Sequence, residues 1–396
     1  MTITECRICT TPLRDIHTFG EVCPVNAFYD TETKYPLGLV YCPECELVQL
    51  SESIDLSAHF SEYYQQSKIA YPPYIIEGYF QEGIRLLTPE DTSYVMEIGC
   101  NDGYLLERYL EAEIKVLGVD PAVNLVEKAL SNGVNAIPGC FNETMAQYIL
   151  NTHGKTPLIH SHHMLAHMDN PLSLIEGIKT LLAPGGTAII DVQYLISVLD
   201  DGVLDNIYHE HIMFYTFNSL NKLLNRAGLT IAQAKLSPTS GGTLCAQVKH
   251  SNEVKAVDAG PWTELEAGKY NNIPYLRERC EVLQTHINNF REYIENNGRM
   301  YGYGAAARAT IFLNLAGINE FIYTIYDDVP EKWDKLLPGT MIGICTSEFL
   351  NLPGASEDDT PIIVFPWHAI DKIVAKWPAH KHRFVSLRDI YLGKVR

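Results

Sequence analysis

Positive charge is what this chain has little of. Its 396 residues include 30 lysines and arginines against 48 aspartates and glutamates, a formal net charge of −18. Nucleic acids and anionic membranes both attract a basic surface. The charge balance therefore argues against nucleic acid and against a membrane as a partner, and a small-molecule substrate is expected.

Long apolar runs and export signals are missing as well. No unbroken apolar stretch is long enough to span a bilayer. The N-terminus has no basic region followed by an apolar core, so no secretory signal is expected. Ten cysteines without export suggest reduced thiols or metal ligands rather than a disulfide framework. The expected compartment is the cytoplasm.

The rest of the composition is that of a soluble globular protein, with 46% hydrophobic and 20% charged residues. A chain of 396 residues is too long for one ordinary hydrophobic core. Two or three domains are therefore expected.

Two C-x-x-C pairs lie near the N-terminus, Cys6 with Cys9 and Cys42 with Cys45. Four thiolates at tetrahedral corners suit Zn²⁺, and a closed shell of four protein ligands is typical of a structural site. Cys23 lies between the pairs and is an alternative ligand, although no second cysteine accompanies it. Buried cysteines without metal are the other interpretation. A redox role is disfavoured because neither pair opens a clear helix after a strand.

A glycine-rich stretch, Glu97-Ile98-Gly99-Cys100-Asn101-Asp102-Gly103, follows a short apolar run and precedes residues with helical spacing. Such a turn lets a ligand lie against bare backbone. The next predicted strand ends in Asp120, which can accept hydrogen bonds from ribose hydroxyls. The carboxylates of Glu97 and Asp102 would repel a pyrophosphate. S-adenosylmethionine (SAM) has no phosphate and carries two cations, so this turn favours SAM over a dinucleotide.

Helices and strands continue to alternate after this turn. A strand is predicted to end over residues 158–163, a helix spans 171–182, and Pro184-Gly185-Gly186 leads into a strand over 187–191. A second strand-turn-helix pattern runs from Met300 to Arg308. This rhythm predicts an α/β fold with parallel sheets covered by helices.

The glycine-rich stretch, Asp120 and the run from Leu181 into Pro184-Gly185-Gly186 resemble class I SAM-dependent methyltransferases. The wider chain resembles the three-domain C-methyltransferases that act on nucleotide-linked deoxysugars, and the most specific motif runs from Asp205 to His211. This resemblance implies a class I methyltransferase (Rossmann-like) domain flanked by a small zinc-binding domain and a second Rossmann-like domain. The expected boundaries are 1–70 for the zinc-binding domain, 71–255 for the SAM-binding domain, and 256–396 for the substrate domain with its linking helix.

The expected SAM site draws on the turn, on the following strand and on two further segments. The tyrosine-rich segment before the turn is most simply interdomain packing, and its alternative role is a lid over adenine or substrate, represented by Tyr64. His163 belongs to a dense histidine cluster with His160, His162 and His167, which strand alternation would divide between two faces. The family has asparagine near this point, so His163 could alter contacts to SAM. The predicted SAM-binding residues are Tyr64, Glu97, Gly99, Asn101, Gly103, Asp120 and His163.

Methylation of carbon requires an enolate or carbanion, because a C–H bond beside a ketone is otherwise no nucleophile. Histidine can remove that proton near neutral pH. A phenol or imidazole can donate to the developing enolate oxygen, and a carboxylate can fix the tautomer of the base. The stretch from Tyr208 to His211 contains all three kinds of group.

The resemblance assigns the base to His211 and makes Tyr208, Glu210 and His167 its functional neighbours. His209 is given no role, because alternation would turn it away if the stretch is extended. Metal binding by His209 with His211 is a competing interpretation. A third interpretation is that these histidines belong to a polar loop and have no catalytic role.

Substrate contacts are expected from the C-terminal third. The segment that contains Ser240 corresponds to a family segment with histidine in its place, and Cys245 stands where that segment has arginine. The backbone at the second glycine-rich turn and Arg308 could hold a diphosphate. His368 stands where the family has asparagine. The predicted substrate-binding residues are Ser240, Gly241, Gly242, Tyr303, Arg308 and His368.

The sequence thus predicts a SAM-dependent C-methyltransferase, and the resemblance implies C3 of a nucleotide-linked 4-keto-6-deoxysugar as the acceptor. One alternative is a non-sugar natural-product carbonyl compound. Another is an NAD(P)-binding oxidoreductase that uses the C-terminal glycine-rich turn. Apolar residues from Leu276 to Ile294 recur at helical spacing, which indicates packing between domains or a dimer seam. A monomer or homodimer is expected.

Overall fold

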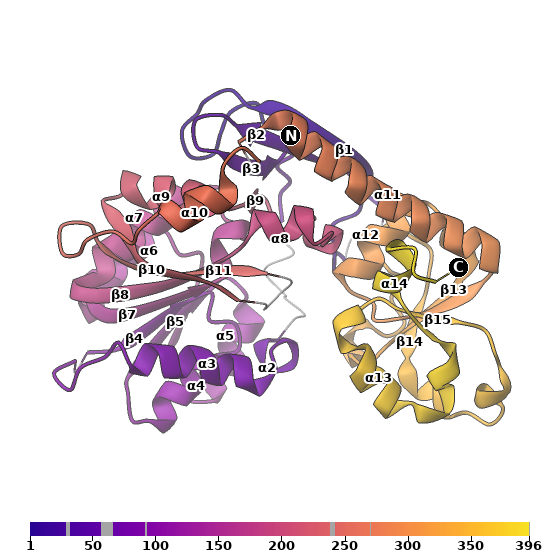
Figure 1. Cartoon of the computed structure of the whole chain (residues 1–396). Coiled ribbons are helices and arrows are strands. Elements are labelled where there is room, and N and C mark those ends of the chain that lie inside the picture. Colours follow the sequence, from indigo (N-terminus) through magenta and orange to yellow (C-terminus); the bar gives the residue numbers. More distant parts are fainter. Residues whose placement is uncertain (29–31, 57–65, 92, 238–241, 270, 396) are drawn as a thin grey trace.

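The computed structural model of the protein describes residues 1–28, 32–56, 66–91, 93–237, 242–269 and 271–395. Within these residues the strands form three sheets with four, seven and five members. Figure 1 shows the sheets in three bodies, with the N-terminal body spanning the top of the other two. This arrangement agrees with the expected α/β organisation.

The N-terminal sheet is antiparallel and has the order β1-β2-β3-β9. Its fourth strand comes from a distant part of the chain, because Val48 pairs with Phe214 and Gln49 pairs with Met213. The sheet of the small domain is therefore completed by a strand from the expected SAM-binding domain. The strands are β1 (Arg14–Val22), β2 (Tyr35–Cys42), β3 (Leu47–Leu50) and β9 (Met213–Phe214).

The central sheet has the order β10-β11-β8-β7-β4-β5-β6. The strands from β8 to β6 are parallel, and β10 and β11 add an antiparallel edge. β8 already begins at Leu182, so the predicted turn at Pro184-Gly185-Gly186 lies inside the strand. The strands are β4 (Val95–Ile98), β5 (Val116–Asp120), β6 (Ala136–Pro138), β7 (Thr156–His162), β8 (Leu182–Gln193), β10 (Leu229–Ser237) and β11 (Thr243–His250).

Helices cover both faces of this sheet (Figure 1). Apolar spacing directs one side of each helix inward, as in α7, where Leu174, Ile175, Ile178 and Leu181 are buried. The helices are α2 (Ser67–Ala70), α3 (Pro73–Ile84), α4 (Tyr104–Glu111), α5 (Val123–Ser131), α6 (Glu143–His153), α7 (Pro171–Leu181), α8 (Leu195–Asp200) and α9 (Phe217–Arg226).

The C-terminal sheet is parallel and has the order β14-β13-β12-β15-β16. The strands are β12 (Met300–Tyr303), β13 (Ile322–Asp327), β14 (Ile344–Thr346), β15 (Ile362–Val364) and β16 (Phe384–Ser386). The helices from the domain junction onward are α10 (Gly260–Glu266), α11 (Ile273–Asn297), α12 (Ala307–Ala316), α13 (Ile370–Lys376) and α14 (Leu387–Tyr391).

The long helix α11 joins the three bodies (Figure 1). It contacts β1 of the N-terminal sheet, α8 of the central domain, and α12 and α14 of the C-terminal domain. Its predicted seam is fully buried within this one chain, as the exposure of Leu276, Leu283 and Ile294 shows. Packing between domains is therefore confirmed, and the dimer interpretation of this seam is wrong.

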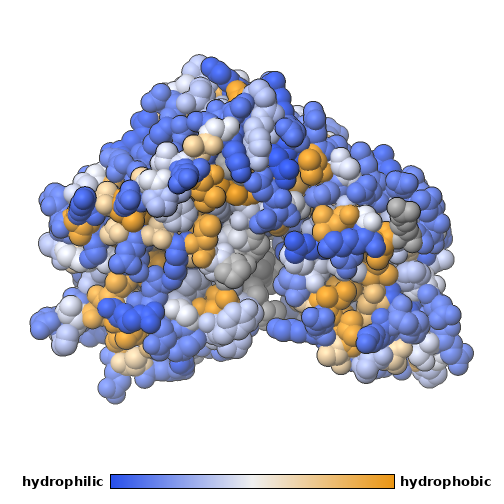
Figure 2. All heavy atoms as spheres, viewed as in Figure 1, coloured by the Kyte–Doolittle hydropathy of each residue, from blue (hydrophilic) through white to orange (hydrophobic). Residues whose placement is uncertain are grey.

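The outer surface is largely hydrophilic, and Figure 2 shows it hollowed between the central and C-terminal bodies. In the part of the chain that the structure describes, no helix has both the length and the apolar character to cross a membrane.

Candidate active site

The glycine-rich turn joins β4 to α4 and brings bare backbone to the carboxyl edge of the central sheet. Gly99 has φ 76°, and a Cβ at this position would lie 2.2 Å from the sulfur of Met164. Gly103 has φ 79° at the start of α4. Both positions therefore require glycine, for backbone conformation and, at Gly99, for space.

Asp120, at the end of β5, ties its strand to the turn. Its Oδ2 accepts a hydrogen bond from the backbone N–H of Asn101 at 2.9 Å, and its Oδ1 accepts one from the N–H of Ala122 at 2.8 Å. The side chain of Asn101 accepts in turn from the backbone N–H of Ser67, the first residue of α2. Asp120 and Asn101 thus form one rigid corner, and their contacts to a ribose stay a prediction.

Two acids in the turn have buried oxygens without a hydrogen-bond partner among the described residues, Oε2 of Glu97 and Oδ1 of Asp102. Burial raises the pKa of Glu97 well above its usual value, and the charges of Asp120 and Asp102 add to this shift. Buried carboxyl oxygens with spare acceptor capacity suit a cationic ligand. The residues present therefore fit SAM, whose amino-acid end carries an ammonium group.

The stretch from Tyr208 to His211, the proposed catalytic stretch, is a turn, since the backbone N–H of His211 donates to the carbonyl of Tyr208 at 2.9 Å. The condition of an extended backbone is therefore not met, yet His209 does point away. Its Nε2 lies 3.2 Å from the carbonyl of Pro36 in the N-terminal domain. The two rings bond different carbonyls, and in the described part of the chain neither His209 nor His211 belongs to a group of three or more side chains that could hold a metal.

The imidazole of His211 is held in one tautomer. Its Nδ1 lies 2.9 Å from the carbonyl of Asn206, which can only accept, so Nδ1 carries the proton. Its Nε2 is then the acceptor, and it faces the hydroxyl of Tyr208 at 2.8 Å and the amide of Gln193 at 3.5 Å. Burial lowers the pKa of His211 well below its ordinary value, and the neighbouring His167 lowers it further. The ring is therefore a neutral base near pH 7.

His167 and Glu210 both lie in this site. The rings of His167 and His211 meet edge to face with centroids 5.0 Å apart. A backbone bond of 2.7 Å from Ile212 to the carbonyl of Ala166 joins their segments. Glu210 is 2% exposed, and after burial its charge is the next cause that raises the pKa of Tyr208.

His163 follows β7 and has φ 59°, which turns it out of the strand. Its backbone N–H donates to the carbonyl of Asp191 at 3.0 Å. Both ring nitrogens are buried without a partner in the described ranges, and burial lowers the pKa of the ring to about 4. The next residue, Met164, packs on Gly99 in the glycine-rich turn, and a contact of His163 with SAM stays a prediction.

The predicted substrate residues separate into three groups. Ser240 and Gly241 lie outside the described residues, as does Tyr64 of the predicted SAM site. Gly242 lies against α8, where a Cβ would be 2.1 Å from Oγ of Ser197. The Tyr303 hydroxyl donates to both oxygens of Asp328 inside the C-terminal domain.

Arg308 and His368 reach the catalytic stretch from the C-terminal domain. The guanidinium of Arg308 bonds the carboxylate of Asp205, which begins the motif that ends at His211. Arg308 also stacks over the ring of Trp367, 5.7 Å from its centroid. Burial lowers the pKa of His368 to about 4, and Arg308 lowers it further while Asp205 opposes the shift. Arg308 thus pairs with a carboxylate of the central domain, and the charge of that carboxylate acts on His368.

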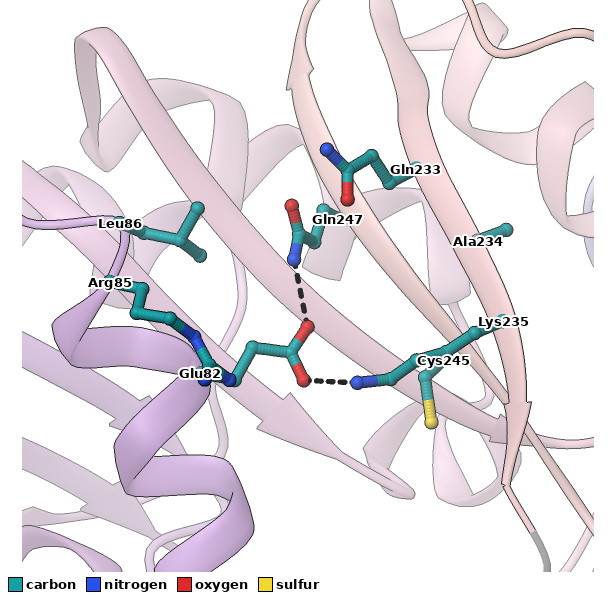
Figure 3. A pocket seen from close by; sticks show the side chains of 8 residues that line it. All are labelled: Glu82, Arg85, Leu86, Gln233, Ala234, Lys235, Cys245 and Gln247. Atoms are coloured by element: carbon teal, nitrogen blue, oxygen red, sulfur yellow. Dashed lines mark hydrogen bonds and ion pairs between the residues drawn. The ribbon is translucent and has the colours of Figure 1, made fainter.

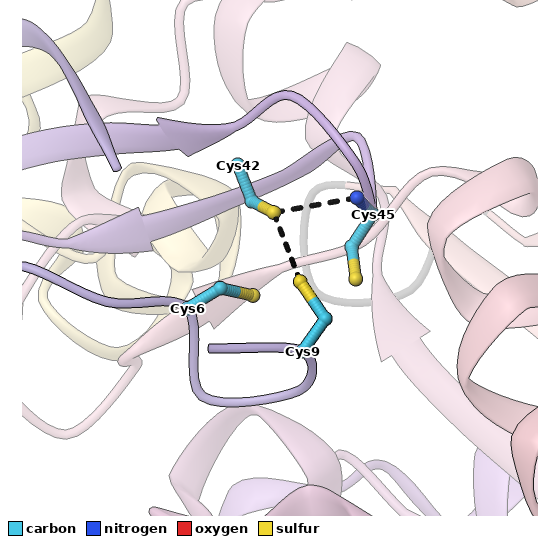
Figure 4. Close-up of side chains that lie close together, drawn as sticks. All are labelled: Cys6, Cys9, Cys42 and Cys45. Atoms are coloured by element: carbon cyan, nitrogen blue, oxygen red, sulfur yellow. Dashed lines mark hydrogen bonds between the residues drawn. The ribbon is translucent and has the colours of Figure 1, made fainter. Parts of the chain in front are cut away.

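The four predicted zinc ligands meet in the N-terminal domain (Figure 4). The sulfurs of Cys6, Cys9, Cys42 and Cys45 all lie within 4.8 Å of one another. Backbone N–H groups of Ile8 and Cys45 point at two of these sulfurs, an arrangement that suits thiolates. The residues therefore fit a tetrahedral Zn²⁺.

Cys23 does not join the four-cysteine group. Its backbone bonds the side chain of Asn314 on α12 of the C-terminal domain, and its thiol is buried. The alternative in which Cys23 replaces a zinc ligand is therefore wrong.

The sequence reasoning missed two polar residues next to this site, Tyr71 and Asp191. Charges of Asp191 and Glu97 add to burial in raising the pKa of Tyr71 to about 12, so this phenol lies near both acids. Asp191 is fully buried on β8, two residues before Gln193. Asp191 could have been found from the sequence, because it is an acid near the carboxyl end of a predicted strand, and ligands of parallel sheets bind at that end.

Three family models match successive parts of this chain. The model "Putative zinc binding domain" matches residues 6–60, "Methyltransferase domain" matches 74–234, and "C-methyltransferase C-terminal domain" matches 238–385. The last match begins before the expected boundary at 255 and includes β11, which pairs with β8 in the central sheet. The exact domain boundaries stay a prediction.

Among curated proteins, C-methyltransferase NovU of Streptomyces niveus is 28% identical over 363 residues, which cover 87% of this chain and 86% of that protein. The ubiquinone biosynthesis O-methyltransferase of Psychrobacter arcticus is 25% identical over 158 residues, covering 34% of this chain and 58% of that enzyme. The match that spans most of this chain is therefore to a C-methyltransferase. The match to an O-methyltransferase covers about a third of the chain.

A solved SAM-dependent methyltransferase from Anabaena variabilis covers 50% of this chain and 96% of its own, with 14% identity and a TM-score of 0.38. Structural similarity at a TM-score of 0.38 does not support a conclusion about function. The family matches and the site agree on SAM as the cofactor and zinc as the structural metal.

Proposed function

We propose that this chain, which belongs to the three-domain SAM-dependent C-methyltransferases, methylates C3 of a nucleotide-linked 4-keto-6-deoxysugar. The observation that carries the proposal is the tautomer of His211, whose Nε2 is an unprotonated nitrogen in a buried site. Carbon methylation needs such a base, whereas methylation of an ionised oxygen does not. The match over most of the chain to C-methyltransferase NovU supports the carbon acceptor.

His211 removes the proton from the carbon beside the ketone of the bound sugar. The hydrogen bond from Nδ1 to Asn206 holds the ring and stabilises the imidazolium that forms. When bound, SAM supplies a methyl group on a sulfonium, which the carbon nucleophile accepts. Tyr208 and His167 lie against the base and donate to the enolate oxygen.

Arg308 and His368 would contact the anionic part of the acceptor. In the described structure Asp205 neutralises Arg308, and the pair lies between the C-terminal domain and the catalytic stretch. A diphosphate would exchange with or bridge this carboxylate, because guanidinium binds both groups in the same geometry. Arg308 therefore couples acceptor binding to the segment that carries the base.

The test is methyl transfer from labelled SAM to a panel of dTDP-, UDP- and GDP-linked 4-keto-6-deoxyhexoses, with the product carbon located by NMR. His211→Asn is expected to lower kcat by about 10³-fold while SAM affinity is unchanged. His153→Asn, at an exposed position on α6, is the control. Full turnover in the His211 variant would remove it from the base role.

A second acceptor class is a non-sugar natural-product carbonyl compound. The observation that favours it is Cys245, which stands where the resemblance implies arginine and which is buried on β11. A cation that would hold sugar or phosphate is therefore missing at this position. Methylation of ketones outside the nucleotide-sugar panel, with no turnover inside it, would favour this class.

The oxidoreductase alternative has less support from the C-terminal turn. The backbone N–H of Ala305 donates to the carboxylate of Asp327 at 2.7 Å, and Lys332 pairs with the same carboxylate. The carboxylate of Asp327 therefore already accepts from the backbone N–H that the phosphate of a dinucleotide would need. Calorimetry with NAD(P) and with SAM separates the two, and binding of NAD(P) without SAM would exclude methyl transfer.

A further inference from the structure

A side-chain amide faces the proposed base from the end of the neighbouring strand. Gln193 is the last residue of β8, and it is 4% exposed. Its Nε2 lies 3.5 Å from Nε2 of His211. Because this imidazole nitrogen takes the substrate proton in the proposed function, Gln193 lies where the reacting carbon of the acceptor must arrive.

The tautomer of His211 decides which end of the amide faces the ring. Nδ1 of His211 donates to the carbonyl of Asn206, so Nε2 carries only a lone pair. The amide of Gln193 must turn its NH2 group toward this nitrogen, because its oxygen would oppose one lone pair with another. Oε1 of Gln193 is therefore left for a different partner.

Oε1 of Gln193 is buried and has no hydrogen-bond partner within the described ranges. The donors of the neighbouring groups serve other acceptors. The Tyr208 hydroxyl bonds Nε2 of His211, and His162 bonds Asp191, two residues earlier on the same face of β8. A buried acceptor without a donor destabilises the folded protein, and at the edge of a site it indicates a ligand that supplies the donor.

The reacting end of the acceptor lies within reach of this oxygen. The oxygen and nitrogen of one amide are about 2.2 Å apart, so Oε1 of Gln193 lies within about 6 Å of Nε2 of His211. A carbon that gives its proton to His211 lies about 3–3.5 Å from the same nitrogen. A hydroxyl or amine on that carbon, or on the next one, can therefore donate to Oε1.

The base does not need Gln193 to hold its ring. Asn206 bonds the ring at 2.9 Å and Tyr208 bonds it at 2.8 Å. The 3.5 Å contact of Gln193 is at the long end of hydrogen bonds. The acceptor carbon must replace both donors at Nε2, and the amide can yield there without the loss of a strong bond.

The strand position of Gln193 also places it beside the predicted substrate segment. In the antiparallel pair of β8 and β11, Gln193 lies opposite Thr243, the residue after Gly242. The backbone N–H of Tyr194 donates to the carbonyl of Gly242 at 3.2 Å. The end of β8 thus borders both the proposed base and the described end of the segment in which substrate contacts are expected.

We propose that Gln193 determines specificity by accepting a hydrogen bond from a hydroxyl or amine on, or next to, the carbon that is methylated. This role rests on the proposed function and defines its acceptor more closely, as a ketone whose reacting end carries a hydrogen-bond donor. A 4-keto-6-deoxysugar that retains such a hydroxyl meets the requirement. The corresponding deoxy compound does not, because it leaves the buried oxygen unpaired.

The test compares two acceptors in several enzymes. The acceptors are the compound that the wild-type protein methylates and its analogue with hydrogen in place of the donor nearest the reacting carbon. Gln193→Met keeps the length of the side chain and removes both amide groups, whereas Gln193→Glu keeps an acceptor oxygen. Methyl transfer from labelled SAM gives kcat/KM for each pair. The ratio of the two values within one enzyme does not depend on how much of it is folded.

The wild-type protein is expected to prefer the donor-bearing acceptor by about 10- to 100-fold in kcat/KM. The preference should fall below about threefold in Gln193→Met, because both acceptors then lack the hydrogen bond. Gln193→Glu should keep a preference of at least about 10-fold. Hydroxyl and amine forms of the acceptor, assayed side by side, identify which donor is read.

Three results would overturn the role of Gln193. One is a wild-type preference below about threefold. The second is an equal loss of kcat/KM for both acceptors in Gln193→Met, which would leave only a positioning role toward His211. The third is the same loss of preference in Gln193→Glu as in Gln193→Met, since the acceptor oxygen would then have no effect.

Gln247→Met is the matched control, because it removes an amide from the same face of the same sheet. The amide of Gln247 bonds Glu82 at 2.8 Å in a groove of about 340 Å³ between α3 and the outer strands. Figure 3 shows this groove, in which Lys235 also bonds Glu82. The control is expected to keep the wild-type preference, and its loss there would also overturn the role of Gln193.

Failure of the proposed function has a different signature. Turnover retained in His211→Asn would remove the base, while the ratio of the two acceptors still tests Gln193. If only non-sugar ketones are methylated, the sugar assignment falls, and a hydroxylated and a deoxy ketone of that class measure the same ratio. If no carbon is methylated, both proposals fall. A normal His211 result beside equal kcat/KM values for the two acceptors would overturn the role of Gln193 alone.

Discussion

The hydroxyl of Tyr208 lies 2.8 Å from Nε2 of His211, the nitrogen that we propose accepts the substrate proton. Because Nδ1 of the same ring donates to Asn206, Tyr208 is the donor in this bond. The acceptor substrate must therefore displace the phenol from the base. The displaced hydroxyl is then free to donate to the enolate oxygen that forms beside it.

Tyr208→Phe is expected to lower kcat by about 10²-fold, because the enolate loses one preorganised donor. The affinity for SAM should stay the same, since Tyr208 does not contact the glycine-rich turn. Steady-state kinetics and calorimetry measure the two quantities. Tyr148→Phe, at an exposed position on α6, is the control. A fall in kcat of less than threefold would show that Tyr208 does not stabilise the enolate.

The buried histidines make stability depend on pH. Burial lowers the pKa values of His160, His163 and His211 below the ordinary value near 6.5. Between the folded and unfolded pKa values the unfolded chain binds more protons, so stability falls as the pH drops below about 6.5. Glu97 contributes with the opposite sign, because its folded pKa is raised.

A substitution isolates one of these groups. His163→Asn removes a ring whose pKa is about 4, and the loss of melting temperature from pH 7 to pH 5 should become smaller than in the wild-type protein. Thermal melts at both pH values measure this difference. His153→Asn, at an exposed position, should leave it unchanged. Equal losses in the wild-type and His163 proteins would contradict the buried neutral state of His163.

The zinc site is expected to position the base. Gln49 donates to the sulfur of Cys6 at 3.3 Å, and its strand pairs with Met213, two residues after His211. Removal of zinc by a chelator should lower kcat and leave SAM affinity unchanged, because the turn at Gly99 belongs to another sheet. Zinc released to a chromophoric chelator, read beside kcat and calorimetry, measures this.

Gln49→Leu tests the connection between the zinc site and the base without replacing a zinc ligand. It leaves the Cys6 sulfur and the backbone N–H of Arg7 without their partner, which costs about 1–3 kcal/mol of stability. Reduced kcat with zinc still bound is the expected result. Gln147→Leu, at an exposed position on α6, is the control. Loss of SAM affinity in parallel with kcat would indicate general unfolding instead of positioning.

Arg308 is expected to bind the anionic part of the acceptor. Arg308→Ala should raise the KM for the acceptor about 10- to 100-fold, because a guanidinium–phosphate pair is lost, while SAM affinity is unchanged. Arg308→Lys should recover only part of this loss, since lysine lacks the planar fork that stacks over Trp367. Arg226→Ala, on an exposed turn of α9, is the control. An unchanged KM would separate Arg308 from the acceptor.

Local patterns predicted the parts of this site that neighbours in sequence build. The two C-x-x-C pairs identify the zinc ligands because each pair forms one short turn. The stretch from Glu97 to Gly103 predicts a glycine-rich turn after β4 because its conformation depends on its own glycines. The helix from Leu276 to Ile294 was also predictable, although spacing alone did not decide what covers its seam.

Long-range pairing was beyond the sequence. Nothing near Met213 indicates that it joins the N-terminal sheet beside Gln49, since this pairing depends on the packing of two domains. The bond between Arg308 and Asp205 likewise joins residues about a hundred positions apart. The stacking of Tyr79 on His162 follows from how α3 lies on the central sheet, which helical spacing does not specify.

Gly99 offers the sharpest test of the SAM turn, because its two constraints can be separated. Gly99→Ala introduces a Cβ that would lie 2.2 Å from the sulfur of Met164, at φ 76°. Gly133→Ala is the matched control, because φ is 85° there and nothing lies within 4 Å of the added carbon. Both variants carry the backbone strain of about 1–2 kcal/mol, and only the first also displaces Met164.

Loss of SAM affinity is therefore expected for Gly99→Ala alone, and calorimetry should show a Kd raised at least about 10-fold, equivalent to about 1.4 kcal/mol. Both variants should melt somewhat below the wild-type protein, since both hold alanine at positive φ. Equal SAM affinities in the two variants would mean that the backbone at Gly99 does not form the SAM cradle. The positions of Glu97 and Asp120 would then need another explanation, because their buried carboxyl groups converge on this same turn.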